Sequence, residues 1–366
     1  MLFCCTRGRS FVVLSFASLL LPLRKFSGMA LSYPKTRQGD ESTSLHGKSI
    51  PDPYRWLEDP DSPEVVSWVK EQQATTSGYF SALNEKRSRI LTRLEQLQNY
   101  PRAGCPYTRA GFSFQSRNTG LQNQDVVYKV DGIDLSDAAA FASADPLLDL
   151  NEMDPAGTTS LGSGAISDDG ILFAYGICRG GSDWQEVHVR DVASGKDLPD
   201  VIPWAKFTSI SWLKDGTGFF YSRFPAPAID AAKAGTETAS TQFSMICLHM
   251  IGGKPEDDLL VWAEPAEPSW ILGCEVTDDG EYVLVYTSYG TDPVNKLAYA
   301  HLPSTLSAWR TTTALGVQSA LEGNSGAPPP HAGGSYLPLI KFVDTFDAQW
   351  EYIANDGPRC AYYSPV

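Results

Sequence analysis

The stretch Asp52-Pro53-Tyr54-Arg55-Trp56-Leu57-Glu58-Asp59-Pro60-Asp61-Ser62 places two prolines around a core of Tyr, Trp and Leu, with acids on either side. Each proline fixes its own φ and disfavours the α region for the residue before it, so this sequence predicts an extended segment with defined corners. Tyr54 and Trp56 would share one face of such a segment and offer a large apolar surface with polar tips. A stiff surface loop with partly buried aromatics is the plainer interpretation.

The residues that follow predict two helices. Ser62 is placed to cap the first helix, with Pro63 at its first position. From about Asn84, apolar residues recur at helical spacing and predict a second helix, whose apolar face we expect to pack as core. The residues of this face are Ile90, Leu91, Leu94 and Leu97. Pro101 ends this part of the chain, so residues 29–100 are predicted to form a short helical N-terminal segment.

After Pro101, short runs rich in Val, Ile, Phe and Tyr alternate with Gly, Asp, Asn and Pro, a pattern typical of strands. A module recurs in which an Asp-Gly pair precedes a β-rich run. Asp-Gly favours a tight hairpin turn, because Gly tolerates positive φ and the Asp side chain can bond the nearby backbone. Its copies are Asp169-Gly170, Asp215-Gly216, Asp279-Gly280 and, more loosely, Asp356-Gly357.

The spacing of these turns bears on the architecture. One four-stranded propeller blade uses roughly 40–50 residues, which fits the first two copies; the wider later gaps require insertions. Residues 225–241, rich in Ala and Thr, and residues 311–335, rich in Gly, Pro and Ser, are the candidate insertions. An ordinary sandwich with several Asp-Gly hairpins is the alternative. The sequence therefore predicts a mainly β fold, with an incomplete β-propeller of about four blades over residues 101–366.

Composition limits the class of partner. The chain has 43 acids against 29 bases and a net charge of −14, so we predict no nucleic acid and no membrane partner, because both need a basic surface. Seven scattered cysteines without a C-x-x-C pair predict neither a zinc site nor a disulfide framework. Reduced thiols in a cytosol-like compartment fit best. The cysteines are Cys4, Cys5, Cys105, Cys178, Cys247, Cys274 and Cys360.

Residues 1–28 differ from the rest of the chain. Bases flank an apolar run from Phe11 to Leu23, and no acid occurs before Asp40. The run is too short for a comfortable transmembrane helix. A targeting leader, either a secretory signal or an organellar transit segment, is one interpretation. The interpretation we rank first is that Met29 is the working start of a cytoplasmic protein.

The stretch from Asp52 to Ser62 resembles the N-terminal signature of the prolyl oligopeptidase family of serine peptidases. The resemblance continues in order from Tyr33 to about Gly357, and it is nearer to the prolyl branch than to the oligopeptidase B type. Further matching segments are Thr119–Gln124, Phe173–Gly176, Gly181–Trp184, Leu198–Val201, Gly235–Thr238 and Asp292–Asn295. The resemblance implies a seven-bladed propeller that caps an α/β-hydrolase domain. It also implies cleavage of short proline-containing peptides after proline, through an acyl-enzyme on serine, with the propeller controlling substrate access.

The catalytic elbow of that family, written roughly G-G-S-x-G-G, is not found in the sequence. Ser182, Ser325 and Ser335 follow or lie among glycines, but the trailing glycine pair is missing or misplaced, and we interpret all three as turn residues. We therefore assign no catalytic, cofactor-binding or metal residue. We expect a truncated form that lacks the hydrolase domain and is inactive alone. A non-catalytic propeller-type protein-binding module is the alternative function.

Other candidate groups are also interpreted as structural. The histidines form no H-E-x-x-H motif, so a zinc peptidase is not predicted, and no Gly-rich loop followed by Lys supports a nucleotide cofactor. They are His46, His188, His249, His301 and His331. The pairs Asp168-Asp169 and Asp278-Asp279 are interpreted as turn residues rather than carboxylate dyads or a cation site. By resemblance, Val189 and Val261 fall near pocket-lining positions of relatives, but their types differ and they receive no role.

Overall fold

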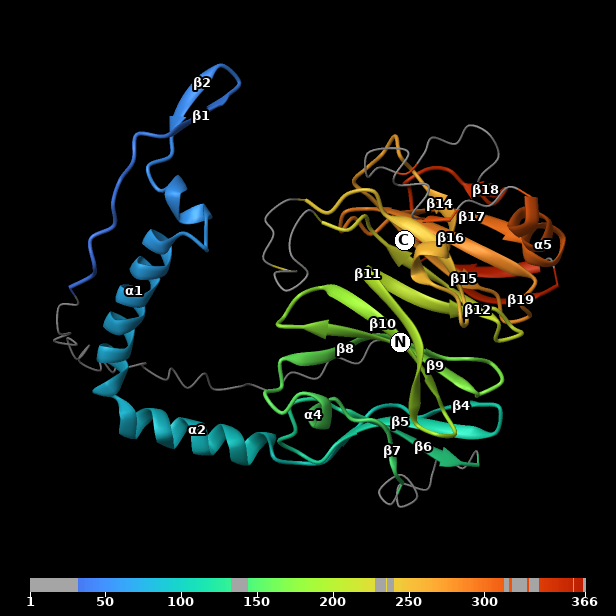
Figure 1. Ribbon diagram of the computed structural model, residues 1–366, viewed down its shortest axis with the longest axis horizontal. Coiled ribbons are helices and arrows are strands. Elements are labelled where there is room, and N and C mark those ends of the chain that lie inside the picture. Colours follow the sequence, from blue (N-terminus) through green and yellow to red (C-terminus); the bar gives the residue numbers. More distant parts are fainter. Residues whose placement is uncertain are drawn as a thin grey trace, which may run out of the picture. The chain divides into compact units, whose positions relative to one another are not determined.

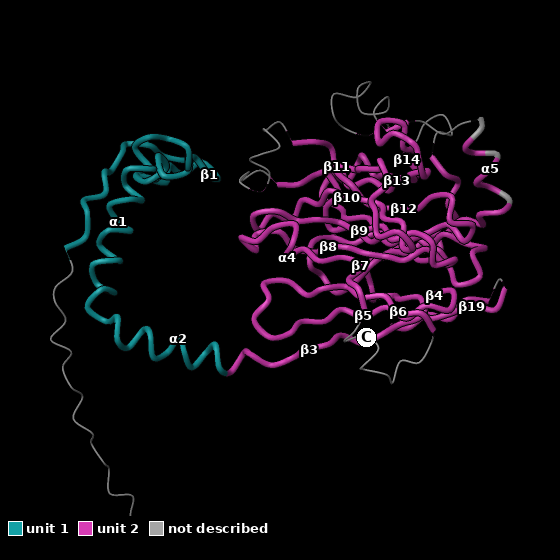
Figure 2. The backbone as a smooth tube through the Cα atoms, turned by 60° about the horizontal axis from the view of Figure 1, so that its bottom comes forward, with its two compact units in different colours: residues 1–96 teal, residues 97–366 magenta. Residues whose placement is uncertain are grey.

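The computed structural model describes residues 32–132, 144–227, 235, 240–312, 316–317, 328, 336–357 and 359–364. The chain divides into two compact units, the first ending at Gln96 and the second beginning at Leu97 (Figure 2). The first unit contains β1 (Ser42–Leu45), β2 (Lys48–Pro51), the 3-10 helix η1 (Arg55–Glu58), α1 (Pro63–Ser81) and most of α2 (Asn84–Gln98).

The segment that was predicted to be extended instead turns at η1. The Leu57 N–H donates to the Tyr54 carbonyl at 3.0 Å, and the Arg55 guanidinium donates to the Asp52 carboxylate at 2.9 Å. The prolines restrict only themselves and the residues before them, which leaves the residues between free to form a helical turn. The expected corner is present at Asp59, which is extended with φ −94° and ψ 93°.

Both helices predicted after Ser62 are present, at α1 and α2. The Ser62 side chain makes no capping hydrogen bond; its carbonyl accepts from the Val66 N–H at 2.9 Å. The expectation that the apolar face of α2 packs as core is wrong for this chain, because four of its side chains are about half exposed. They are Ile90 at 48%, Leu91 at 51%, Leu94 at 51% and Leu97 at 50%.

The second unit consists of antiparallel sheets that we name as blades in chain order (Figure 1). Blade 1 contains β3 (Arg102–Ala103), β4 (Tyr107–Arg109), β5 (Phe112–Asn118), β6 (Val126–Asp131) and β7 (Pro146–Leu148); blade 2 contains β8 (Thr159–Ile166), β9 (Leu172–Arg179), β10 (Trp184–Asp191) and the first part of β11 (Lys196–Trp212). Blade 3 contains the end of β11, β12 (Gly218–Arg223), β13 (Met245–Met250) and β14 (Leu259–Ala263); blade 4 contains β15 (Trp270–Val276), β16 (Tyr282–Tyr289), β17 (Asn295–His301) and β18 (Ile340–Val343). A further hairpin follows, made of β19 (Glu351–Asp356) and β20 (Arg359–Tyr363); the loops carry the helices α4 (Leu150–Met153), η3 (Pro255–Asp257) and α5 (Leu302–Thr312).

Strand β11 belongs to two blades. Its first part pairs with β10 as far as Lys206, and it pairs with β12 at Ala205 and again from Ile210 to Trp212. The register breaks between Ala205 and Ile210, where Phe207 adopts a left-handed φ of +49°. The break bends the strand, as β-bulges do. One continuous seven-stranded sheet, from β8 to β14, is thereby divided into two blades.

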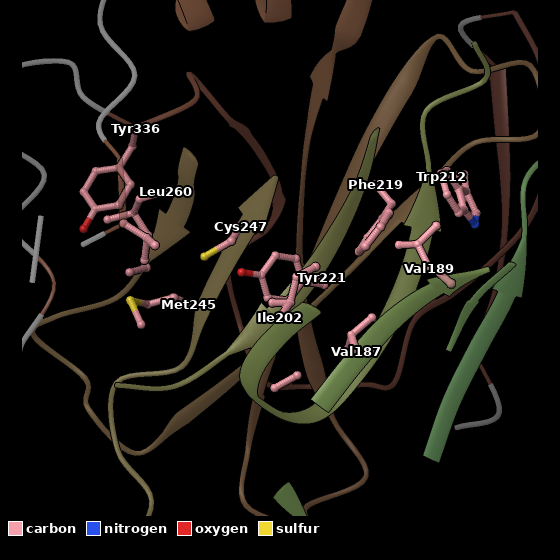
Figure 3. Packing of buried hydrophobic residues seen from close by; sticks show 14 residues of the cluster. Val187, Val189, Ile202, Trp212, Phe219, Tyr221, Met245, Cys247, Leu260 and Tyr336 are labelled. Atoms are coloured by element: carbon pink, nitrogen blue, oxygen red, sulfur yellow. The ribbon is translucent and has the colours of Figure 1, made fainter. Parts of the chain in front are cut away.

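Side-chain packing decides between a propeller and a sandwich. Along β12, Phe219 and Tyr221 pack in a cluster with blade 2 (Figure 3). Phe220, between them in sequence, packs in a different cluster with blade 4. Phe114 of blade 1 and Tyr175 of blade 2 share a third cluster. A sandwich has one core between two sheets, but here interior blades are covered on both faces by their chain neighbours. The prediction of a partial propeller of about four blades is therefore confirmed.

The Asp-Gly pairs occupy equivalent places in successive blades. Asp169-Gly170, Asp215-Gly216 and Asp279-Gly280 each join the first and second strands of a blade, and Asp356-Gly357 joins β19 to β20. In blade 1 the same turn is Ala110-Gly111, which lacks the aspartate and was not recognised in the sequence. Residues 225–241 and 311–335, the candidate insertions, lie partly outside the described residues.

Candidate functional site

The first strands of blades 2, 3 and 4 are neighbours in space, and with β19 we call them the inner wall: β8, residues 208–212 of β11, β15 and β19. The indole N–H of Trp212 donates to the Ala165 carbonyl at 3.0 Å and joins β11 to β8. Ser209 Oγ donates to the Cys274 carbonyl at 3.1 Å and joins β11 to β15. Polar groups at the ends of neighbouring strands therefore hold the wall together across the blade boundaries.

The inner wall exposes mainly small and aliphatic groups. Leu161 on β8 and Ile353 on β19 keep 37% and 58% of their surface exposed, and Ser209 is exposed on β11. A Cβ added at Gly273 on β15 would meet nothing within 4 Å. Such a surface can contact an extended, uncharged peptide by van der Waals packing, but these groups offer neither an activated nucleophile nor a general base.

One carboxyl group of the wall lies in a cavity that the sequence did not reveal. A cavity of about 700 Å³ between blade 4 and β19 is lined by Glu275, Tyr286, Trp350 and Tyr352, among other residues. Burial raises the pKa of Glu275, and the hydrogen bond from the Tyr286 hydroxyl at 3.2 Å only partly offsets this. These residues are distant in sequence and form no motif, so sequence patterns carried no signal for them.

A second cavity of about 860 Å³ lies beside α5. Leu213, Leu248 and Leu302 line its apolar part, and Lys254 and Arg310 also contribute to the lining. Among the described residues that line either cavity there is no histidine and no cysteine. Neither cavity thus brings together the nucleophile and base of a triad.

The structure places Ser182 in the turn between β9 and β10. Its hydroxyl oxygen accepts from the Trp184 N–H at 3.1 Å, and its own N–H donates to the Arg179 carbonyl at 3.0 Å. These bonds stabilise the turn, and no histidine takes part in them. The other two serines considered in the sequence, Ser325 and Ser335, lie outside the described residues.

Carboxylates lie within hydrogen-bond distance of three histidine rings. His188 Nε2 lies 2.9 Å from Glu186 Oε1, and His301 Nε2 lies 3.0 Å from Glu281 Oε2. His249 lies between two buried aspartates. His46 forms the β1–β2 turn at φ +51°, and His331 lies outside the described residues.

The second aspartate of each pair bonds the backbone and a hydroxyl of its own turn. Asp169 Oδ1 accepts from the Ser167 hydroxyl at 2.5 Å and from the Ile171 N–H at 3.0 Å. Asp279 repeats this arrangement in blade 4, accepting from the Thr277 hydroxyl and the Glu281 N–H at 2.7 and 3.0 Å. The same four-residue pattern, Ser or Thr followed by Asp-Asp-Gly, thus builds the same turn twice.

Val189 and Val261, which by resemblance fall near pocket-lining positions, are both fully buried. Val189 packs beside Trp212 and Phe219 in the cluster between blades 2 and 3 (Figure 3). Val261 belongs to the cluster between blades 3 and 4. In this chain both side chains are part of the interblade core.

The described residues contain neither a metal site nor a membrane-spanning helix. No group of three or more His, Cys, Asp or Glu side chains there has the geometry to hold a metal ion. Five cysteines in that part, Cys105, Cys178, Cys247, Cys274 and Cys360, are free thiols. None of the helices described is both long and apolar enough to cross a membrane.

Comparison with known proteins identifies the family. Residues 34–361 match the family model described as prolyl oligopeptidase, N-terminal beta-propeller domain. Prolyl oligopeptidase A of Amanita bisporigera is 30% identical over 347 residues, which are 89% of this chain and 42% of that protein. Prolyl endopeptidase of Elizabethkingia meningoseptica is 32% identical over 262 residues, which are 72% of this chain and 35% of that protein.

A solved structure agrees with the sequence matches. Prolyl oligopeptidase B from Galerina marginata, bound to a 25mer macrocyclization substrate, superposes with a TM-score of 0.72 at 26% identity. The alignment covers 91% of this chain and 44% of that one. The chain thus spans less than half the length of these relatives. On this evidence the chain belongs to the prolyl oligopeptidase family and corresponds to its N-terminal β-propeller domain.

Proposed function

We propose that this chain is the propeller portion of a serine endopeptidase that cleaves short peptides on the carboxyl side of proline, and that the propeller controls substrate access. The observation that carries the proposal is the match over residues 34–361 to the family's propeller domain. The inner wall supports it physically. A propeller lid suits this task, because narrow access would admit short flexible peptides and exclude folded proteins.

We also propose that the chain has no peptidase activity by itself. The sequence contains no G-G-S-x-G-G elbow. Ser182, the described candidate, is bonded within its own turn, and the rings of His188 and His249 are bonded to carboxylates. A serine hydroxyl needs an adjacent base to become a nucleophile at neutral pH.

A turnover assay tests this proposal. The purified 366-residue chain is incubated with a chromogenic peptide that carries proline before the scissile bond, and with the same peptide carrying alanine. A full-length prolyl oligopeptidase serves as the positive control. We expect the control to cleave the proline peptide and the chain to cleave neither. Cleavage by the chain that a serine-reactive phosphonate abolishes would contradict the second proposal.

The peptidase role itself needs a test that can fail separately. Sequencing the transcript that encodes the chain should show an open reading frame with a G-G-S-x-G-G elbow followed by the aspartate and histidine of a hydrolase domain. A transcript without any such elbow would instead support the second candidate function, a non-catalytic protein-binding module. The apolar clusters between the blades favour that candidate, because a binding module must fold without further domains. Size-exclusion chromatography with thermal melting checks this, since a binding module requires a cooperative soluble monomer.

We propose a cytoplasmic location, with Met29 as the working start. Support comes from the free thiols of the described cysteines, because a protein of an oxidising compartment usually pairs them. Mass spectrometry of the N-terminus of the protein isolated from its source tests the proposal. A mature N-terminus at residue 29 or 30 supports it. A cleavage site elsewhere, with the protein recovered from an organelle or the medium, contradicts it.

A further inference from the structure

His249 is completely buried, and both of its ring nitrogens face carboxylates. Nδ1 lies 2.6 Å from Asp258 Oδ1, and Nε2 lies 3.0 Å from Asp200 Oδ1. A neutral imidazole has one N–H donor and one acceptor nitrogen, whereas the imidazolium has two donors. When both carboxyl groups are ionised, two acceptors at these distances match the doubly protonated, cationic ring.

The ring joins two blades. His249 lies on β13 and Asp258 follows η3, so both belong to blade 3. Asp200 lies on the first part of β11, which pairs with β10 in blade 2. The Asp200 carboxylate also accepts from the Gly252 N–H at 2.6 Å through Oδ1, while its Oδ2 is buried without a partner in the described part of the chain. Asp200 therefore depends on blade 3 for the hydrogen bonds that offset its burial.

The other titratable and charged groups around the ring come from β12 and β13. The Tyr221 hydroxyl donates to Asp258 Oδ2 at 2.7 Å. Arg223 is buried and interacts electrostatically with Asp258 and Tyr221, and the Cys247 thiol is buried beside them. Two carboxylates are thus balanced by the Arg223 guanidinium and a cationic His249. Loss of the His249 charge leaves this buried cluster with a net negative charge.

Proton binding by the cluster is linked to folding. Burial alone would lower the pKa of His249, but the hydrogen bonds and charges of Asp258 and Asp200 outweigh burial and raise it above 6.5. Burial also raises the pKa of Asp258, partly offset by His249 and Tyr221. A group that binds its proton more tightly when folded contributes stability that is lost as pH rises through its folded pKa. The contribution of His249 is therefore complete below 6.5 and is lost as pH rises through its raised pKa.

We propose that His249 is a pH-sensitive latch, which holds blade 2 to blade 3 as an imidazolium and releases the seam between them when it loses a proton. Deprotonation places a nitrogen lone pair opposite a buried carboxylate, which is repulsive. Nε2 makes the longer of the two contacts, so we take its proton to be the one lost, and Asp200 then keeps one hydrogen bond, from Gly252. With fewer hydrogen bonds across it, the seam between blades 2 and 3 becomes weaker as pH rises through the His249 pKa.

Amide hydrogen exchange of the full chain tests the latch directly. The Gly252 N–H, bonded to Asp200, reports the seam, and the neighbouring Ile251 N–H, bonded within blade 3 to the Thr217 carbonyl at 3.0 Å, is the reference. After correction for intrinsic exchange, we expect Gly252 protection to fall about tenfold per pH unit above the His249 pKa, because one proton is lost. Protection of Ile251 should not change. A ratio of Gly252 protection to Ile251 protection that stays constant from pH 6 to pH 9 would overturn the proposal.

Nitrogen chemical shifts of the His249 ring provide a second readout that does not depend on a variant folding. At pH 6.5 more than half of the rings should show the nitrogen shifts of imidazolium, because the His249 pKa is raised, and a mostly neutral ring at that pH would contradict the latch. Two variants complete the test. Asp200→Asn removes the interblade charge and should make Gly252 protection independent of pH. His188→Gln is the matched control, because His188 bonds Glu186 on its own strand β10, and it should leave the pH dependence of Gly252 unchanged.

Discussion

Lys214 Nζ lies 2.9 Å from Asp168 Oδ2, and this ion pair joins the first turn of blade 3 to the first turn of blade 2. From the other side, Arg109 of blade 1 lies 3.9 Å from Asp168 Oδ1. Farther along, the Asn355 side-chain amide of β19 donates to the Asp279 carboxylate of blade 4. The turns that repeat along the sequence are therefore neighbours in space. The Asp-Gly turns that the sequence repeats therefore also make contacts between neighbouring blades.

The Lys214–Asp168 pair predicts a small, salt-sensitive coupling. Both side chains are about one-third exposed, so a double-mutant cycle with Lys214→Met and Asp168→Asn should give a coupling of roughly 0.5 kcal/mol in the free energy of unfolding. Urea unfolding at low and high salt measures it, and 1 M NaCl should remove most of it. A coupling that is unaffected by salt would show that the two side chains interact by packing rather than by charge.

Gly218 is predicted to tolerate no side chain. A Cβ built at Gly218 would overlap the His249 backbone carbonyl on the paired strand, so Gly218→Ala should destabilise the chain by about 1–3 kcal/mol. Gly273→Ala is the control, because that strand glycine has open space around its Cβ position. It should change stability by less than about 1 kcal/mol. Similar losses for both variants in urea unfolding would contradict the close approach.

Trp212 is predicted to stabilise the inner wall through its indole N–H as well as its bulk. Trp212→Phe keeps an aromatic ring but leaves the Ala165 carbonyl of β8 without its donor, which should cost about 1–2 kcal/mol of unfolding free energy. Trp204→Phe is the comparison, since the Trp204 indole has no hydrogen-bond partner among the described residues. If the two substitutions cost the same, the bond between β11 and β8 carries no stability.

Asp197 predicts a stability contribution that disappears in acid. Arg190 donates to both of its carboxylate oxygens, at 2.7 and 3.0 Å, and the Tyr175 hydroxyl donates at 2.9 Å. Burial opposes ionisation, but these donors outweigh it and lower the pKa of Asp197 below 3.8. Because its side chain is 35% exposed, Asp197→Asn should cost only about 1 kcal/mol at pH 7.

The sign of this effect distinguishes it from that of His249. A carboxyl whose pKa is lowered by folding contributes stability above 3.8, and the contribution is lost as pH falls through the folded value. The difference in melting temperature between the parent chain and Asp197→Asn should therefore shrink below pH 3.8. A difference that grows in acid would contradict the assignment of Arg190 and Tyr175 as stabilising donors.

Local signals made much of the fold predictable. The Asp-Gly turns and the helix beginning at Pro63 depend on the conformational preferences of a few adjacent residues, and the structure confirms them. The looser copy at Asp356-Gly357 also proved to be a hairpin turn. Features without such a signal were missed. The sequence around Ala205 does not show that β11 changes partners there, because the partners β10 and β12 are set by tertiary pairing.

The candidate site was less predictable than the fold. His249, Asp200 and Asp258 form no motif, since Asp200 lies on another blade and reaches the ring only after folding. The cavity beside Glu275 is likewise lined by residues of blade 4 and of β19 that are distant in sequence, so no local pattern predicts it. Family resemblance placed Val189 and Val261 near pocket positions, but packing between blades decides that both are core.

The central claim is that this chain is a prolyl oligopeptidase propeller that carries no catalytic serine of its own. Labelling with a fluorophosphonate, followed by peptide mass spectrometry, tests it most directly. The purified chain and a full-length prolyl oligopeptidase are treated side by side at pH 7. We predict stoichiometric labelling of the full-length enzyme at its elbow serine and none of the chain. Stoichiometric labelling of Ser182, or of any other serine in these 366 residues, would contradict the claim.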